Sequence, residues 1–190
     1  ADALPGQYRL SVGLYGADNR RLRAYDGQTG VDLGGQITLQ PRPVIRWAAM
    51  TTTPSLDQPV AYHFEGVGDL VGWSQDASTH TLRVGLVWRA AESDIMTEYV
   101  VFVHLRRNDA LVAQSDGIPA GGTRPITGWR AGEYIVDEHD IGTAGLTSDA
   151  YDLYVGLYDP MTGVRVPVTD DASRSLPNGE VLLGLVSVSP

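Results

Sequence analysis

The chain has 190 residues, a formal net charge of −9 and no cysteine. A negative surface repels nucleic acid and anionic membranes, and no apolar run approaches the roughly 18 residues of a membrane span, so we expect neither nucleic acid as a partner nor membrane insertion by this chain. The lack of cysteine excludes disulfides, thiol catalysis and thiolate metal sites.

The first predicted strands lie near the N-terminus. Residues 8–15 read YRLSVGLY, and every second residue is apolar or aromatic, which is typical of a half-buried strand. After a polar turn, a second strand is expected at 21–25 and a closing strand, LGGQITLQP, at 33–41. The side of the first strand expected to face a core consists of Tyr8, Leu10, Val12 and Leu14.

The middle of the chain predicts further strands of the same kind. Residues 59–75 hold one or two of them, and residues 97–106 are β-branched and aromatic, as in a central strand. A tight turn at 107–110 predicts a hairpin into 111–116, and 133–139 is another alternating strand. In the segment 80–90, one face consists of Leu82, Val84, Leu86 and Trp88, so we expect Trp88 in the core.

A repeat organises the chain. Residues 151–158 read YDLYVGLY and share six of eight letters with 8–15, at an offset of 143 from residue 8 to residue 151. Aligning the closing strand 33–41 with 183–190 gives an offset of 150, which attributes a longer loop, 169–180, to the second copy. The inward-facing set of the second copy is expected to be Tyr151, Leu153, Val155 and Leu157.

The repeat predicts two domains from a tandem set. Residues 42–190 form one complete unit, and residues 1–41 are the C-terminal part of a preceding repeat, with three strands. A lone three-stranded fragment cannot bury its apolar face, so 1–41 is expected to pack on the main unit or on another chain, by self-association or strand exchange. Trp47 would join the two parts. The alternative is that 1–41 belongs to the main sandwich and the repeat marks a duplicated hairpin.

These elements predict an all-β fold. About eight strands, frequent turn residues and no helical pattern indicate an antiparallel β-sandwich with immunoglobulin-like or jelly-roll topology.

The stretches HFEGVGDLVGWSQDAS and YVVFVHLRRNDALVAQSDGIPAGGTRPITGWRAGEYIVDEHDI, followed by YDLYVGLYDPMTGVRVPV, resemble a β-sandwich module of bacterial exported and membrane proteins. Such modules often accompany glycosyltransferase segments of the protein mannosyltransferase type. The resemblance covers about 60–190, with 4–40 as the tail of a second copy, and implies an extracytoplasmic accessory domain. The module's function is not established, so no catalytic residue is carried over, and the transferase segments are absent from this chain.

The longest irregular segment, 117–132, is the first candidate binding site, because long loops at sandwich ends often carry binding residues. An exposed tryptophan in it would stack on a sugar, with planar hydrogen-bonding side chains beside it. The alternative is that this tryptophan folds back to plug the end of the sandwich. The candidate ligand-binding residues are Trp129, Arg124, Arg130, Tyr134 and Trp73.

An acidic cluster at 137–140 is the second candidate. Alternation sends Asp137 and His139 to one face and the two neighbouring acids to the other. With Asp116 and Asp159 from nearby segments, Asp137 would supply oxygen ligands for a structural calcium ion, the one cofactor we consider. The alternative is a solvated acidic edge that discourages aggregation.

Catalytic patterns are weak. The hairpin places His104 opposite Ala113 or Gln114, so a contact with Asp116 is expected only diagonally. None of the serines considered as nucleophiles, Ser93, Ser115 and Ser148, lies in an elbow motif.

We therefore expect a non-catalytic extracytoplasmic module of a larger membrane or exported protein, which recognises glycans or partner proteins. One alternative is a structural spacer without a ligand, favoured by buried tryptophans and a featureless surface. The other is a hydrolase, favoured by a His–Asp–Ser cluster in a cleft.

Overall fold

The computed structural model describes residues 6–7, 9–39, 44–45 and 49–188. The chain divides into two compact units, one of residues 7–45 and one that contains residues 46–190 together with 1–6. The larger is called the main unit below and the smaller the N-terminal unit. Trp47, predicted to join the two, lies outside the described residues.

A five-stranded antiparallel sheet forms one layer of the main unit, in the order β12-β9-β8-β7-β14. Strands β7, β8 and β9 are consecutive in the chain, and β12 and β14 join them at the two edges. The bounds are β7 Gln58–Phe64, β8 Gly68–Ser78, β9 Thr81–Ala90, β12 Tyr134–Gly142 and β14 Val168–Thr169.

A four-stranded antiparallel sheet, in the order β11-β10-β13-β15, forms the other layer. The chain crosses to the five-stranded sheet after β11, returns for β13, and crosses again through β14 before β15. The bounds are β10 Val100–Arg107, β11 Ala110–Gly117, β13 Asp149–Tyr158 and β15 Glu180–Val188.

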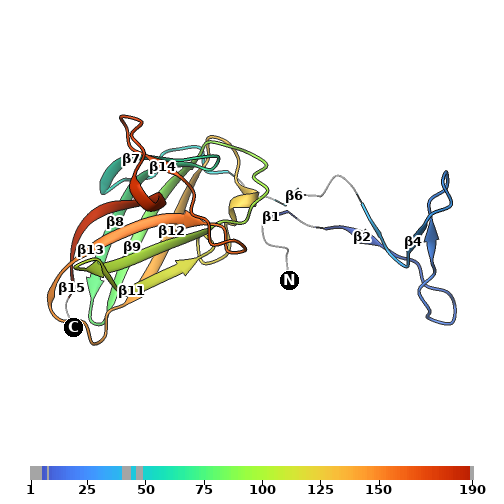
Figure 1. Ribbon diagram of the computed structural model, residues 1–190, viewed down its shortest axis with the longest axis horizontal. Coiled ribbons are helices and arrows are strands. Elements are labelled where there is room, and N and C mark those ends of the chain that lie inside the picture. The colour runs from blue at the N-terminus through green and yellow to red at the C-terminus, as the bar shows by residue number, and fades with distance from the viewer. Residues whose placement is uncertain (1–5, 8, 40–43, 46–48, 189–190) are drawn as a thin grey trace. The chain divides into compact units, whose positions relative to one another are not determined.

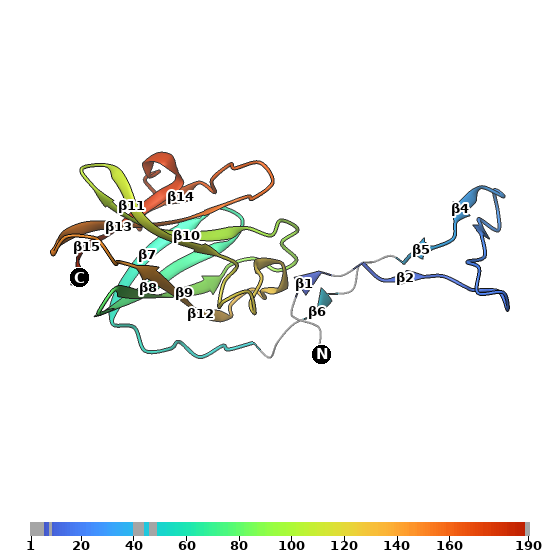
Figure 2. The ribbon, with the colours of Figure 1, turned by 90° about the horizontal axis from the view of Figure 1, so that it is seen from below.

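The two sheets pack face to face, so the predicted all-β antiparallel sandwich is confirmed (Figures 1 and 2). The choice between immunoglobulin-like and jelly-roll topology stays a prediction. Two 3₁₀ turns, Ile126–Gly128 and Pro177–Gly179, are the helical segments in the described part of the chain. None of the described residues forms a helix long and apolar enough to cross a membrane.

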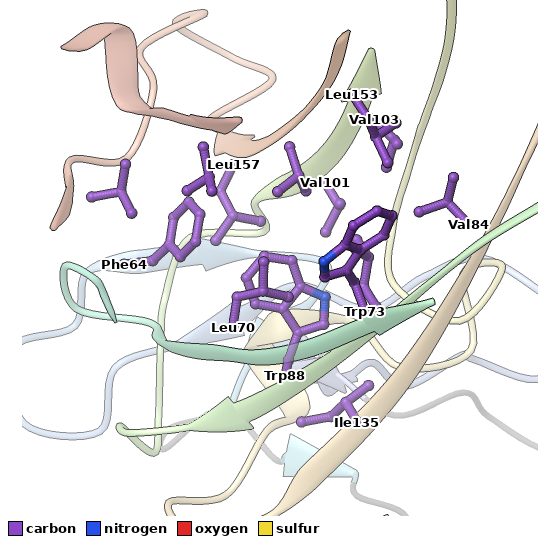
Figure 3. Packing of buried hydrophobic residues seen from close by; sticks show 14 of the residues in the cluster. Phe64, Leu70, Trp73, Val84, Trp88, Val101, Val103, Ile135, Leu153 and Leu157 are labelled. Carbon is purple, nitrogen blue, oxygen red and sulfur yellow. The ribbon is translucent and has the colours of Figure 1, made fainter. Parts of the chain in front are cut away.

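The core lies between the sheets, where side chains of both layers point toward one another (Figure 3). The edge of the Phe64 ring meets Trp88, with 5.2 Å between the ring centroids. The alternation predicted for 80–90 is confirmed, because the predicted inward residues are all buried. Those residues are Leu82, Val84, Leu86 and Trp88, and the buried hydrophobic residues of β13 are Tyr151, Leu153, Val155 and Leu157.

The β10–β11 hairpin also follows the prediction. Asn108 and Asp109 form the two-residue turn, both with positive φ (49° and 64°), the conformation that suits the twist of a tight hairpin. The pairing places His104 opposite Gln114 and Phe102 opposite Asp116, one of the two predicted registers.

The N-terminal unit, with Gly6 before it, contains short strand pairs: β2 with β5 and β3 with β4, both antiparallel, and β1 with β6. Its strands are β1 Gly6–Gln7, β2 Ser11–Val12, β3 Ala24–Tyr25, β4 Asp32–Gly34, β5 Ile37–Thr38 and β6 Val44–Ile45.

The hydrogen bonds of this unit repeat those of the second copy. Tyr15 bridges Arg21 as Tyr158 bridges Arg165. The Leu22 amide donates to the carbonyl of Leu14, as the Val166 amide does to that of Leu157.

The closing strands align differently from our prediction. Val12 pairs with Ile37 in the first copy, and Val155 pairs with Val181 in the second. The offset between residues 37 and 181 is therefore 144, and the predicted offset of 150 was wrong. The turn that begins at Asp26 ends at Val31, whereas the turn that begins at Asp170 ends at Arg174, so the second copy has the shorter turn. The letters LG at 33 and 183 misled the alignment.

Candidate functional site

The loop 117–132 closes one end of the sandwich and does not present its tryptophan to solvent. Trp129 is 1% exposed, and its ring centroid lies 6.4 Å from that of Trp88 in the core. The indole Nε1–H donates to the carbonyl oxygen of Arg124 at 2.9 Å, so its polar atom is satisfied inside the loop. This is the plug that we considered as the alternative.

Three carboxylates hold the loop in this position. Glu98 accepts hydrogen bonds from the Ile126 amide at 3.1 Å and the Thr127 hydroxyl at 2.9 Å, and burial raises the pKa of Glu98. Glu133 is 1% exposed and pairs with Arg124 at 3.0 Å. The third is Asp137, which accepts from the Ala120 amide at 2.7 Å. The loop is therefore fixed by carboxylates that lie outside it in the chain, which a local sequence pattern does not reveal.

The other predicted sugar ligands do not form a platform with Trp129. Trp73 is 4% exposed and belongs to the core. Tyr134 is half-buried, and its hydroxyl accepts a hydrogen bond from Thr53 at 3.0 Å. Arg130 is exposed. Stacking on a sugar needs an exposed aromatic face, so this set does not supply the site that we predicted.

The three predicted calcium ligands are held in different surroundings. Asp137 is 0% exposed and contacts the Ala120 amide and the His139 imidazole. Asp116 lies 3.3 Å from His104 Nε2. Asp159 caps its own turn, accepting from the Met161 amide at 2.8 Å. Within the described residues, no three His, Cys, Asp or Glu side chains are grouped as a metal site requires. A calcium ion therefore gains no support from these aspartates.

The diagonal contact predicted for His104 is present. Its Nε2 lies 3.3 Å from the Asp116 carboxylate, on the face of the four-stranded sheet away from the core. Burial lowers the pKa of His104; Asp116 opposes this effect, and Arg106 and Arg165 reinforce it. His104 is therefore buried, whereas its partner Asp116 is exposed at the edge strand β11.

A Ser–His–Asp chain of contacts escaped the sequence analysis. Nε2 of His139 lies 3.0 Å from Asp137, and its Nδ1 lies 3.4 Å from the hydroxyl of Ser115. The contacts join β11 to β12, the edge strands of the two sheets. The imidazole is 5% exposed and the carboxylate 0%, so a substrate would have no access to them. The long serine contact and this burial point to a bridge between the sheets.

A surface trough beside β7 is a candidate site. It consists of two depressions of about 460 and 410 Å³, within the size range of ligand sites. Both depressions are lined by Val60, Ala61, Tyr62, Asp170 and Asp171, and we call them together the Tyr62 trough.

Local geometry explains the trough. Strand β14 pairs with β7 only at Phe64 and His63, so the edge of β7 from residue 58 to 62 extends beyond it. One extra residue forms a bulge between Pro59 and Tyr62. The chain beyond β14 turns at Asp170, which accepts hydrogen bonds from the Ala172 and Arg174 amides at 3.0 and 2.9 Å. This turn forms the second wall.

The trough combines one partly exposed aromatic ring with polar groups of both charges. Arg174 pairs with Asp170 at 2.7 Å, and that hydrogen bond lowers the pKa of Asp170. In the second depression, His63 Nδ1 lies 2.8 Å from the Asp69 carboxylate. Hydroxyl groups of Thr169 and Ser173 add neutral donors and acceptors.

Sequence reasoning had placed a strand around Tyr62 but did not identify a site there. The wall residues are about 110 positions away in the chain, and their turn carries no ligand motif. Only the pairing of β14 with β7 brings the two segments together. Comparisons of the chain with family models, with curated proteins and with solved structures found no match.

Proposed function

We propose that the chain is a non-catalytic recognition module that binds a glycan-like, polyhydroxylated ligand in the Tyr62 trough. The observation that carries the proposal is the combination of a half-buried aromatic side chain with carboxylates and a guanidinium in a trough of ligand size. An aromatic ring packs against sugar C–H groups, and planar charged side chains accept and donate to hydroxyls. An extracytoplasmic location and a glycosyltransferase-bearing parent protein are further parts of the proposal, and they rest on the resemblance described above.

Two observations support a non-catalytic module. The Ser115–His139–Asp137 contacts are buried between the sheets, without the exposed serine that acyl transfer needs. The His104–Asp116 pair lies on the other face of the four-stranded sheet, where the His104 side chain is buried.

The spacer alternative also has an observation in its favour. The three tryptophans within the described residues, Trp73, Trp88 and Trp129, are all buried. The Tyr62 trough is the feature that separates the two functions, because a spacer needs no such site.

The test is binding of the purified chain to a broad glycan array, with and without calcium. Tyr62→Ala should weaken binding at least tenfold in apparent affinity, and Asp171→Asn should weaken it to a smaller extent. Tyr99→Ala is the matched control, because this partly buried tyrosine lines a different depression, of about 480 Å³. Equal binding by wild type and Tyr62→Ala would contradict the site, and silence across the array would favour the spacer.

A further inference from the structure

The N-terminal unit is a set of strands whose apolar side chains are exposed, although their counterparts in the main unit are buried. Leu10, Val12 and Leu14 are 50%, 47% and 69% exposed, so the core-facing role predicted for them is not found within this unit. Their counterparts Leu153, Val155 and Leu157 are each 0% exposed. Leu22 and Ile37 are 50% and 38% exposed, against 4% and 0% for Val166 and Val181.

The two copies otherwise share their backbone geometry and even a side-chain contact. Arg21 donates to Gln36 at 3.2 Å in the first copy, and Arg165 donates to Glu180 at 2.7 Å in the second. The local structure is therefore the same, and the burial differs because of what lies against it.

A close approach at one glycine is the same in the two copies. A Cβ on Gly13 would lie 2.9 Å from the carbonyl oxygen of Gly35, and a Cβ on Gly156 would lie 2.7 Å from that of Gly179. Only glycine allows the closing segment to approach this closely in either copy. In both copies, the closing segment therefore passes the strand at the glycine with the same close approach.

The main unit shows what covers such a face. Strand β13 pairs with β10 along one edge, from Val100–Tyr158 to Arg106–Asp152, and with β15 along the other. Its inward side chains pack on the five-stranded sheet. In the described part of the N-terminal unit, β2 has β5 as its strand neighbour, and no strand lies along its other edge.

The uncovered face is apolar and also contains a depression. A depression of about 230 Å³ is lined mainly by apolar side chains and glycines, together with Arg23. An exposed apolar sheet face with a free edge is a site of strand addition. Its lining includes Val12, Gly13, Leu14, Leu22, Gly35 and Ile37.

We infer that residues 7–45 are the closing strands of a second β-sandwich, docked on a partner that supplies strands equivalent to β7–β12. A β10-like strand of the partner would pair with the free edge of β2, and its apolar sheet would cover Leu10, Val12 and Leu14. The residues 49–188 of the same chain do not provide this place, because β13 and β15 occupy it. The inference is independent of the Tyr62 trough.

The experiment uses the full chain together with a probe, the polypeptide of residues 49–142, which carries β7–β12 and lacks β13–β15. The chain has no cysteine, so Val12→Cys gives a single position for an environment-sensitive fluorophore. We expect a blue shift and a 1:1 complex when the probe is added. A fluorophore at Thr29→Cys, on an exposed turn, is the control and should not shift.

The double variant Leu10→Asp, Leu14→Asp should lose the complex by at least tenfold in affinity. Both residues are exposed, so the variant leaves the main unit folded. If the probe is insoluble alone, co-expression replaces titration. The probe should then become soluble with the wild-type chain and not with the double variant.

Two results would overturn the inference. A shift that depends on the concentration of the labelled chain without the probe would show that two N-terminal units cover each other. The absence of a shift and of soluble probe in every combination would show that the exposed face does not accept such a sheet.

Discussion

Two segments of this protein have nearly the same sequence and the same local hydrogen bonds but opposite burial. Leu153 is fully buried, and Leu10 is half exposed, although each lies in the third position of the repeated octet. Since a strand gains most of its stability from the face that it buries, the first copy has the geometry of a sandwich strand without its main source of free energy. The comparison shows that the repeat alone does not make a folded unit.

The largest expected difference comes from removing the same side chain in each copy. Leu153→Ala should lower the free energy of unfolding by about 3 kcal/mol, because it removes buried contacts and leaves a cavity. Leu10→Ala should change it by less than about 0.5 kcal/mol, as for an exposed position. Urea unfolding followed by tryptophan fluorescence measures both. Equal losses would show that the first copy is covered in solution.

The second difference concerns the repeated arginine contact. In the main unit, Glu180 binds Arg106 through two hydrogen bonds of 2.8 Å and also Arg165, with the carboxylate 6% exposed. Burial tends to raise the pKa of Glu180, but the two arginines outweigh it and hold that pKa below its usual value.

Glu180→Gln should therefore cost about 2–3 kcal/mol, because two partly buried guanidinium groups lose their counter-charge. In the first copy, Gln36→Glu creates the analogous ion pair with Arg21 at the surface, worth about 0–1 kcal/mol. Thermal unfolding of both variants measures the difference. A cost of Glu180→Gln no larger than the gain from Gln36→Glu would contradict the importance of burial.

A smaller, pH-dependent difference should come from His104 on β10, a strand for which the described residues show no counterpart beside β2. Burial lowers the pKa of His104 from 6.5 in the folded state, with Asp116 opposing and Arg106 and Arg165 reinforcing the effect. Between the folded pKa and 6.5 the unfolded chain binds more protons, so stability falls as the pH is lowered through this window.

His104→Gln should remove that part of the pH dependence. Urea midpoints of wild type and variant, measured from about pH 7.5 down to pH 5, give the comparison. The difference between the two curves isolates this histidine from the other three in the chain. Parallel curves would show that protonation of His104 is not linked to folding.

The smallest expected effect lies in the repeated turns. Hydrogen bonds from Thr29 lower the pKa of Asp26, and hydrogen bonds from Arg174 lower that of Asp170, both from a usual value of 3.8. The stabilisation of each turn is thus present above 3.8 and is lost as the pH falls through the lower folded value. Carboxyl NMR titration should show both aspartates below 3.8, and an unshifted Asp26 would mean that only the second turn is formed.

Many features of the main unit could be predicted from short-range sequence patterns. The alternation around Val84 and Leu86, the two-residue turn at Asn108 and Asp109, and the diagonal His104–Asp116 contact are all consequences of strand period and register. These features need only the neighbouring residues of one strand or one hairpin.

The candidate sites were predictable to a smaller extent. Trp129 was one candidate ligand, but it packs against Trp88 in the core. The loop that carries it is held by Glu98, Glu133 and Asp137, and no pattern within 117–132 specifies these partners. The Tyr62 trough depends on the short pairing of β14 with β7 and on the bulge beside it. Both features arise from contacts between residues far apart in the chain.

The repeated octet separates what the local sequence determines from what the tertiary structure decides. By itself, the sequence determined the strand alternation, the glycine that lets the closing segment approach, and the hydrogen bonds that join the octet to the following turn. Whether Leu10 and Leu153 meet solvent or a core was decided only by the tertiary structure, because burial requires a second surface and the octet supplies only one.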